Sequence, residues 1–195
     1  MNVKRAIPLF IIILGFLLPF VSCRQSGNKE KNHSYTKKDT ITEKTDSISP
    51  GNLKIDDLNY IIFGIFCGNC GGECATMYKL DQVKNELLVD HTDSYWKMSP
   101  MKPMVFETKI SDNIKINTAK KIVDSIPSFL LTSSELKKQF GCPDCTDGCG
   151  IYLEINNNKF IKQYRIDSQT DQLSDSIKPF AEYLKKTIRQ LRGRE

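Results

Sequence analysis

Two clusters of cysteines constrain this chain more than any other feature of its sequence. Each cluster has the spacing C-x2-C-x3-C, and together they hold six of the seven cysteines, the seventh being Cys23. The clusters consist of Cys67, Cys70 and Cys74, and of Cys142, Cys145 and Cys149. Clustered cysteines pair as disulfides or bind a metal ion, and either outcome can join parts of the chain that are far apart in sequence. A fold for this chain must therefore satisfy both clusters.

The N-terminus predicts export and a lipid anchor. Lys4 and Arg5 precede an uncharged apolar segment that is too short, and too interrupted by proline, to span a membrane comfortably. The segment ends in Phe-Val-Ser-Cys, which resembles the lipoprotein box of bacteria, where the cysteine receives a diacylglyceryl group and fatty acids such as palmitate. We therefore predict a lipoprotein signal peptide over residues 1–22 and lipidation at Cys23. An ordinary cleaved signal peptide and an uncleaved anchor are the alternatives.

Residues 23–52 predict a lipid-anchored flexible stalk, because they are rich in polar and charged side chains and hold too few apolar ones to form a core. Cleavage before Cys23 removes two basic residues, so the formal net charge of +5 falls by two. A charge that small does not indicate nucleic-acid binding. The predicted partners are the membrane, through the lipid on Cys23, and an unidentified component of the bacterial cell envelope, on its periplasmic or outer-membrane face.

Residues 53–195 have the usual size of one domain and contain both cysteine clusters. Short runs rich in Ile, Val, Tyr and Phe, separated by polar turns, indicate strands that mostly follow one another as hairpins. The clearest turn is Asn156-Asn157-Asn158, because asparagine tolerates the positive φ of a tight turn. The predicted strands are 58–66, 75–80, 86–90, 104–110, 151–155 and 160–166.

Two helices are predicted. Residues 118–126 carry apolar side chains at helical spacing before Pro127, and residues 177–191 carry one apolar stripe, with Asp175 or Ser176 as the N-cap. Arginines near the end of the second helix suit its negative pole. Because the strands form hairpins and the helices lie apart from them, we predict an α+β domain. Its antiparallel sheet carries a C-terminal amphipathic helix and one or two further helices, and disulfides staple it.

Structural disulfides are the preferred interpretation of the six clustered cysteines. Thiols outside the cytoplasm oxidise, and lipidation of Cys23 leaves an even number of cysteines to pair. The first cluster follows the strand that ends at Phe66, and the second precedes the strand that begins at Ile151. If these strands are antiparallel neighbours, both clusters lie at one end of the sheet. We therefore predict that at least one disulfide links the two clusters.

The same cysteines have two alternative interpretations. A zinc ion bound by Cys70, Cys74, Cys142 and Cys145 would form a four-thiolate site, since Cys142-Pro-Asp-Cys145 resembles a zinc-ribbon knuckle. A thiol redox pair would use Cys142 and Cys145, or Cys67 and Cys70. Redox pairs favour a helix N-terminus, however, and the second pair precedes a predicted strand.

A run of methionines supplies a further metal alternative. Met98, Met101 and Met104 are spaced three residues apart in a proline-rich segment, and thioethers are soft ligands that select Cu(I). The preferred interpretation is a loop whose methionines cover the edge of the core. We therefore predict no cofactor, with zinc or copper as the alternatives.

The sequence offers little for catalysis. His91 is the only histidine of residues 53–195, and no nucleophile elbow, phosphate-binding glycine loop or HExxH motif occurs. We predict a binding or structural role in the envelope rather than an enzyme, and we assign no catalytic residue. An exported metal-handling protein and a thiol redox protein are the alternative functions.

Three segments carry a resemblance to small uncharacterised lipoproteins of Bacteroidetes-type bacteria. They begin at Phe63, Gly141 and Tyr164, and read FGIFCGNCGGEC, GCPDCTDGCGIY and YRID. The resemblance covers most of residues 53–195. It implies an exported, lipid-anchored domain, and it brings with it no known activity and no catalytic residue.

Overall fold

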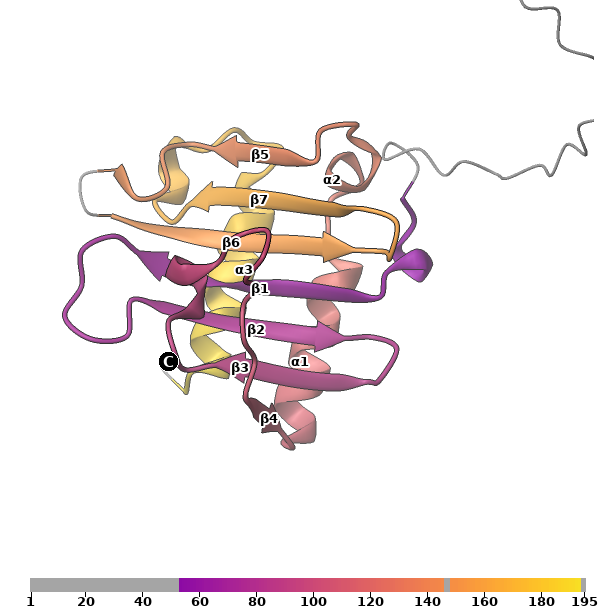
Figure 1. The fold of residues 1–195 in the computed structure, drawn as a ribbon. Coiled ribbons are helices and arrows are strands. Elements are labelled where there is room, and N and C mark those ends of the chain that lie inside the picture. The colour runs from indigo at the N-terminus through magenta and orange to yellow at the C-terminus, as the bar shows by residue number, and fades with distance from the viewer. Residues whose placement is uncertain (1–52, 146–147, 194–195) are drawn as a thin grey trace, which may run out of the picture. The chain divides into compact units, whose positions relative to one another are not determined.

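The structure is a computed structural model that describes residues 53–145 and 148–193. The predicted signal peptide, the lipidation site Cys23 and the predicted stalk lie outside the described residues. Within them, seven strands form one sheet with helices packed on one face, which confirms the predicted α+β class (Figure 1). No helix of the described residues is both long enough and apolar enough to cross a membrane.

The sheet is built mainly from antiparallel neighbours in the order β4-β3-β2-β1-β6-β7-β5. Its strands are β1 (Tyr60–Cys67), β2 (Ala75–Asp81), β3 (Glu86–Asp90), β4 (Thr108–Ile110), β5 (Lys137–Phe140), β6 (Cys149–Asn156) and β7 (Ile161–Asp167). The central strand β1 pairs antiparallel with β2 on one side and with β6 on the other. The predicted hairpins β2–β3 and β6–β7 are both present.

Two strands differ from the sequence-based expectation. β5 pairs parallel with β7, so the sheet is mixed rather than purely antiparallel. The sequence does not predict β5, because Lys-Lys-Gln-Phe is polar and lies exposed at the sheet edge, where lysines deter pairing with another chain. The predicted strand 104–110 is shortened to the three residues of β4, because Met104 and Phe106 pack against a hydrophobic cluster on one face of the sheet instead of pairing in it.

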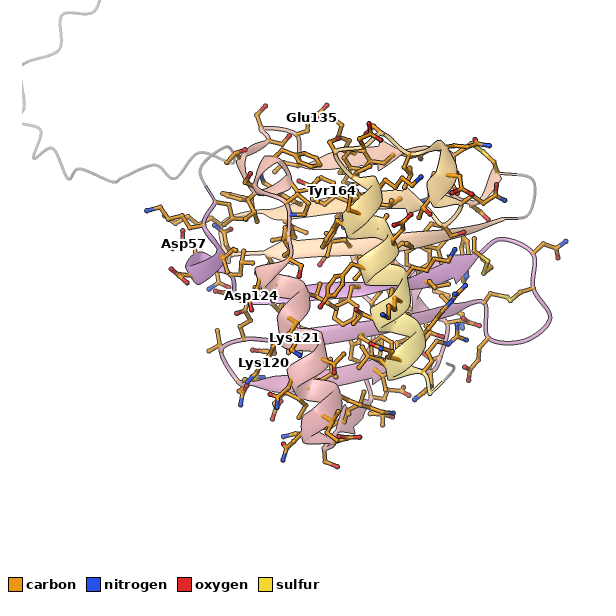
Figure 2. The ribbon with its side chains drawn as sticks, turned by 180° about the vertical axis from the view of Figure 1, so that it is seen from behind. Asp57, Lys120, Lys121, Asp124, Glu135 and Tyr164 are labelled. Carbon is orange, nitrogen blue, oxygen red and sulfur yellow. A yellow bond between two sulfur atoms is a disulfide. The ribbon has the colours of Figure 1, made fainter. Side chains whose placement is uncertain are left out.

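The C-terminal helix α3 (Lys178–Leu191) packs its apolar stripe on the sheet, as predicted (Figure 2). Phe180, Leu184 and Ile188 are buried along this stripe. The predicted N-cap is wrong, because neither Asp175 nor Ser176 occupies that position. Ile177 is the N-cap and makes no side-chain capping bond, and proline stands within the first turn.

The helix α1 (Asn113–Asp124) lies beside α3 on the same face of the sheet (Figure 2). It begins five residues earlier than predicted because Asp112 caps it, accepting hydrogen bonds from the amides of Ile114 and Lys115 at 2.8 and 3.3 Å. A short helix, α2 (Ser128–Thr132), follows. The buried Lys162 of β7 donates to the carbonyls of Leu131 and Ser133, at 2.5 and 2.6 Å, and so satisfies the C-terminal end of α2.

The face of the sheet away from α1 and α3, here called the outer face, is covered by the segment between β3 and β4 (Figure 1). This segment holds the short 3-10 helix η3 (Ser94–Lys97). Tyr95 is buried there against Phe66, with ring centroids 4.8 Å apart, and Met104 and Phe106 pack on the same cluster. The domain therefore has a large core under the helices and a smaller one on the outer face.

Candidate functional site

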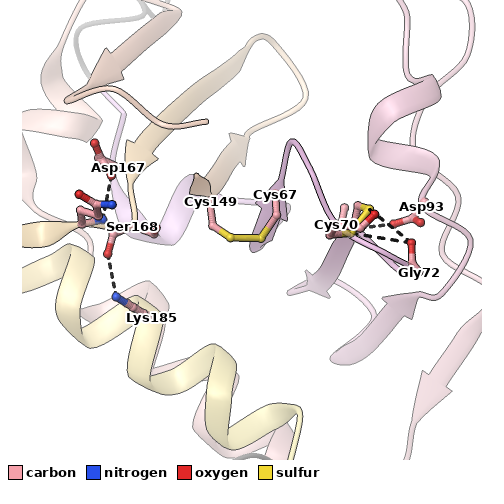
Figure 3. Close-up of a disulfide and its surroundings, with 11 residues drawn as sticks. Cys67, Cys70, Gly72, Asp93, Cys149, Asp167, Ser168 and Lys185 are labelled. Atoms are coloured by element: carbon pink, nitrogen blue, oxygen red, sulfur yellow. Dashed lines mark hydrogen bonds between the residues drawn. A yellow bond between two sulfur atoms is a disulfide. The ribbon is translucent and has the colours of Figure 1, made fainter. Parts of the chain in front are cut away.

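All six clustered cysteines lie where β1 ends and β6 begins, an end of the sheet called the cysteine end below. Figure 3 shows Cys67 and Cys149 bonded there. The six cysteines form the disulfides Cys67–Cys149, Cys70–Cys74 and Cys142–Cys145. The first of these joins the two clusters, which confirms the prediction of a link between them. The three bonds are consistent with a location outside the cytoplasm.

The Cys67–Cys149 disulfide joins the two central strands. The two cysteines face each other in the register of β1 and β6, so both side chains leave the sheet on the same face. This is the helix-covered face, because Ile65 and Ile151, two residues along each strand, belong to the core under the helices. The bond closes a segment of the chain with a sequence separation of 82 residues.

The other two disulfides shape local turns. Cys142 and Cys145 bracket a turn closed by a hydrogen bond from the amide of Cys145 to the carbonyl of Cys142, 3.1 Å long. Asp144 within this turn has φ +70°, and Asp167 at the end of β7 accepts from the amide of Cys142 at 3.0 Å. Cys70–Cys74 closes the loop between β1 and β2. The cysteine end thus consists of two turns closed by disulfides on either side of one central bond.

A cavity of about 410 Å³ lies beside the Cys67–Cys149 disulfide. It is lined by Ile65, Cys67, Cys149, Ser168, Lys185, Arg189 and Arg192. The Lys185 Nζ donates to the carbonyl of Ser168 at 2.7 Å, which holds this half-buried side chain against the end of β7 (Figure 3). None of the described residues that line the cavity is acidic. We call it the basic cavity.

The structure places the predicted zinc ligands in two separate disulfides. Cys70 is bonded to Cys74, and Cys142 to Cys145, so the four thiolates that the zinc alternative needs are paired. Within residues 53–145 and 148–193, no group of three or more His, Cys, Asp or Glu side chains is arranged to hold a metal ion. A thiol redox function would use the same Cys142–Cys145 bond in its oxidised form.

The three methionines of the copper alternative lie in different environments. Met101 is 96% exposed at the tip of a tight turn in which Ser99 and Lys102 exchange backbone hydrogen bonds. Met98 is 37% exposed, whereas Met104 packs against the outer-face cluster. Met104 therefore covers the edge of the core, as the preferred interpretation predicts, and the other two thioethers face solvent.

A buried carboxylate on the outer face is a polar site that the sequence does not reveal. Glu154 of β6 accepts hydrogen bonds from Tyr152 Oη at 2.6 Å, Gln163 Nε2 at 3.0 Å and Tyr60 Oη at 3.3 Å. Burial and the neighbouring Glu154 carboxylate raise the pKa of Tyr60 to about 12 and raise that of Tyr152 further. Alternation along β6 places Glu154 on the outer face, but only the tertiary structure brings its three partners to it.

Asp90 at the end of β3 organises the segment that covers the outer face. It is fully buried and accepts hydrogen bonds from the amides and hydroxyls of Thr92 and Ser94, at 2.6 to 2.9 Å. The Ser94 hydroxyl in turn accepts from the amide of Val105 at 2.8 Å. Burial alone would raise the pKa of Asp90, but these hydrogen bonds outweigh it and leave the pKa below its ordinary value.

Asp90→Asn is expected to lower the free energy of unfolding at pH 7 by about 2 kcal/mol, because an amide nitrogen cannot accept hydrogen bonds. Because the pKa of Asp90 is lowered by folding, its contribution is present at neutral pH and is lost as the pH falls through the folded-state value. Denaturant unfolding of both proteins at several pH values measures this. The two stabilities should converge on acidification, whereas the exposed Asp56→Asn should change little at any pH. A loss in the free energy of unfolding that does not vary with pH would contradict this account.

The six cysteines of the described residues are all paired in disulfides, so none is a free thiol nucleophile. His91, the histidine considered for catalysis, is exposed at the end of β3. Comparison of the chain with protein-family models and with curated proteins finds no match. The cysteine end and its basic cavity are therefore the features on which a function can be argued.

Proposed function

We propose that this chain is an exported protein, anchored in a membrane by lipid on Cys23, whose disulfide-stapled domain binds a partner or ligand in the cell envelope. One observation carries the proposal: every cysteine of the described domain has a disulfide partner. Cys23 is then the remaining cysteine of the chain. A chain with an odd number of cysteines makes chemical sense in an oxidising compartment when the odd thiol is modified.

A binding role, rather than a purely structural one, is supported by the basic cavity. It is an open concave site of the size that small ligands occupy, and it lies on a rigid base formed by two central strands and their disulfide. Binding sites built on such a base hold their side chains in place without needing the ligand to order them.

Cys23→Ala is expected to move the protein from the membrane fraction to the soluble fraction of cells and to abolish incorporation of labelled palmitate. Without an acyl chain on Cys23, no described residue supplies a membrane span. Ser26→Ala, three residues further along, is the matched control and should leave both properties unchanged. Membrane binding that persists in the Cys23→Ala protein would reject the lipid anchor and indicate an uncleaved N-terminal anchor.

A further inference from the structure

The three basic residues of the basic cavity come from one stripe of α3. Lys185, Arg189 and Arg192 are spaced at i, i+4 and i+7, so they project from one side of the helix. The apolar stripe of the same helix is buried on the sheet. The basic stripe therefore lines the same cavity as the Cys67–Cys149 disulfide and Ile65 at the end of β1.

Among the described residues, no ion pair involves these three cations. The ion pairs of the described residues are Lys109–Glu86, Lys138–Glu135 and Lys178–Asp171, and none includes a residue of the basic cavity. Like charges at i, i+4 on a helix repel one another. Three cations around one cavity, with no acidic residue among its described lining, thus produce a local positive potential that a bound anion would relieve.

The helix dipole does not account for the arrangement by itself. Basic side chains near a helix C-terminus are stabilised by the negative pole, which suits Arg189 in the last turn and Arg192 at the C-cap. Lys185 lies more than a turn before the end of α3, and a hydrogen bond to Ser168 holds it at the cavity. Arg192 lies near the buried Tyr78, whose pKa burial raises to about 12 although the guanidinium lowers it. Both Lys185 and Arg192 are half-buried.

We propose that the basic cavity binds a small molecule that carries at least two negative charges, as carboxylate or phosphate groups. This deepens the binding role proposed above by giving its ligand class. Arginine guanidinium groups bind carboxylates and phosphates with two parallel hydrogen bonds, and Lys185 keeps ammonium hydrogens free beyond its bond to Ser168. Ile65 and the disulfide sulfurs supply an apolar side to the cavity, which suits the carbon skeleton of such a molecule.

Titration calorimetry with citrate and with inorganic pyrophosphate tests the proposal. The full chain carrying Cys23→Ser, exported to an oxidising compartment, provides a protein free of detergent. Arg189→Gln together with Arg192→Gln should weaken binding of the preferred anion at least about tenfold. The matched control removes two charges elsewhere, through Lys121→Gln together with Lys186→Gln, both exposed. It should change the affinity less than about twofold, apart from screening by salt.

Amide chemical shifts locate the bound anion independently of affinity. Saturating citrate or pyrophosphate should shift the amide signals of Ser168, Cys149 and Ile65 in the wild type, and the arginine variant should lose these shifts. Equal weakening in both double variants, or shifts confined to residues far from the basic cavity, would overturn the proposal and leave only non-specific attraction between a basic protein and an anion.

A third measurement distinguishes a lipid headgroup from a soluble anion as the ligand. Co-sedimentation of the same protein with phosphatidylglycerol vesicles, compared with phosphatidylcholine vesicles, reports binding to a lipid headgroup. The headgroup of phosphatidylglycerol carries one negative charge. Vesicle binding that requires the two arginines, without binding of citrate or pyrophosphate, would therefore overturn the proposal in favour of a lipid headgroup. Binding of citrate or pyrophosphate without vesicle binding would support a soluble anion. The test for lipid on Cys23 is independent of these results, so a failure of one proposal does not imply a failure of the other.

Discussion

Replacing Cys67 and Cys149 together by alanine is expected to lower the free energy of unfolding by about 4 to 5 kcal/mol. The disulfide closes a segment with a sequence separation of 82 residues, and the entropy that it removes from the unfolded chain grows with the length of the closed segment. That loss is a large part of the total stability of an ordinary domain. Guanidinium unfolding of the exported proteins, followed by circular dichroism, measures it.

The chain supplies its own matched control for this prediction. Cys70→Ala with Cys74→Ala removes a bond whose sequence separation is only 4 residues, so the expected loss is about 2 kcal/mol. If both double variants lose the same stability, the long-range closure does not make the larger contribution that this argument assigns to it. Peptide mapping without reduction should first establish that each variant retains its other two disulfides.

Gly64→Ala is expected to lower the free energy of unfolding by about 3 kcal/mol or more, because overpacking a tight interior forces the backbone to move. Gly64 lies in the central strand β1, between Met77 of β2 and Tyr152 of β6. A methyl group there would overlap the carbonyl oxygen of Thr76 and would come within 2.9 Å of the Met77 Cα. Both are backbone atoms, so no change of side-chain rotamer relieves the overlap.

Gly71→Ala is the control for Gly64→Ala, since a methyl group at Gly71 meets no atom within 4 Å. Its stability should remain within about 0.5 kcal/mol of the wild type. Thermal unfolding followed by circular dichroism compares the two variants with the parent. A Gly64→Ala protein as stable as the Gly71→Ala protein would mean that β1 and β2 can separate without cost, which the continuous pairing of these strands opposes.

The sequence predicts the middle of this fold better than its edges. Buried strands such as β1 and β6 are rich in apolar residues, and the stripe of α3 repeats with helical spacing, so local pattern is sufficient for them. The edge strand β5 is polar because it is exposed, and its parallel pairing with β7 depends on contacts that only the folded chain creates. The start of α1 differs because a single capping residue, Asp112, extends the helix beyond its apolar pattern.

Only part of the candidate site can likewise be predicted from the sequence. A disulfide between the clusters is predictable because it needs only that β1 and β6 be antiparallel neighbours. The partners within each cluster are not, since spacing alone permits several pairings. The basic cavity cannot be predicted from the sequence. Arg189 and Arg192 have the pattern of an ordinary helix end, and the cavity exists only because α3 crosses the sheet beside the disulfide.

The chain enters the domain at the end of the sheet that lies opposite the cysteine end. The 3-10 helix η2 (Ile55–Asp57) leads into the start of β1, and β1 then runs to the cysteine end. The first described residues and the basic cavity therefore lie at opposite ends of the sheet. A ligand that enters the basic cavity thus approaches the domain from the end of the sheet opposite its first described residues.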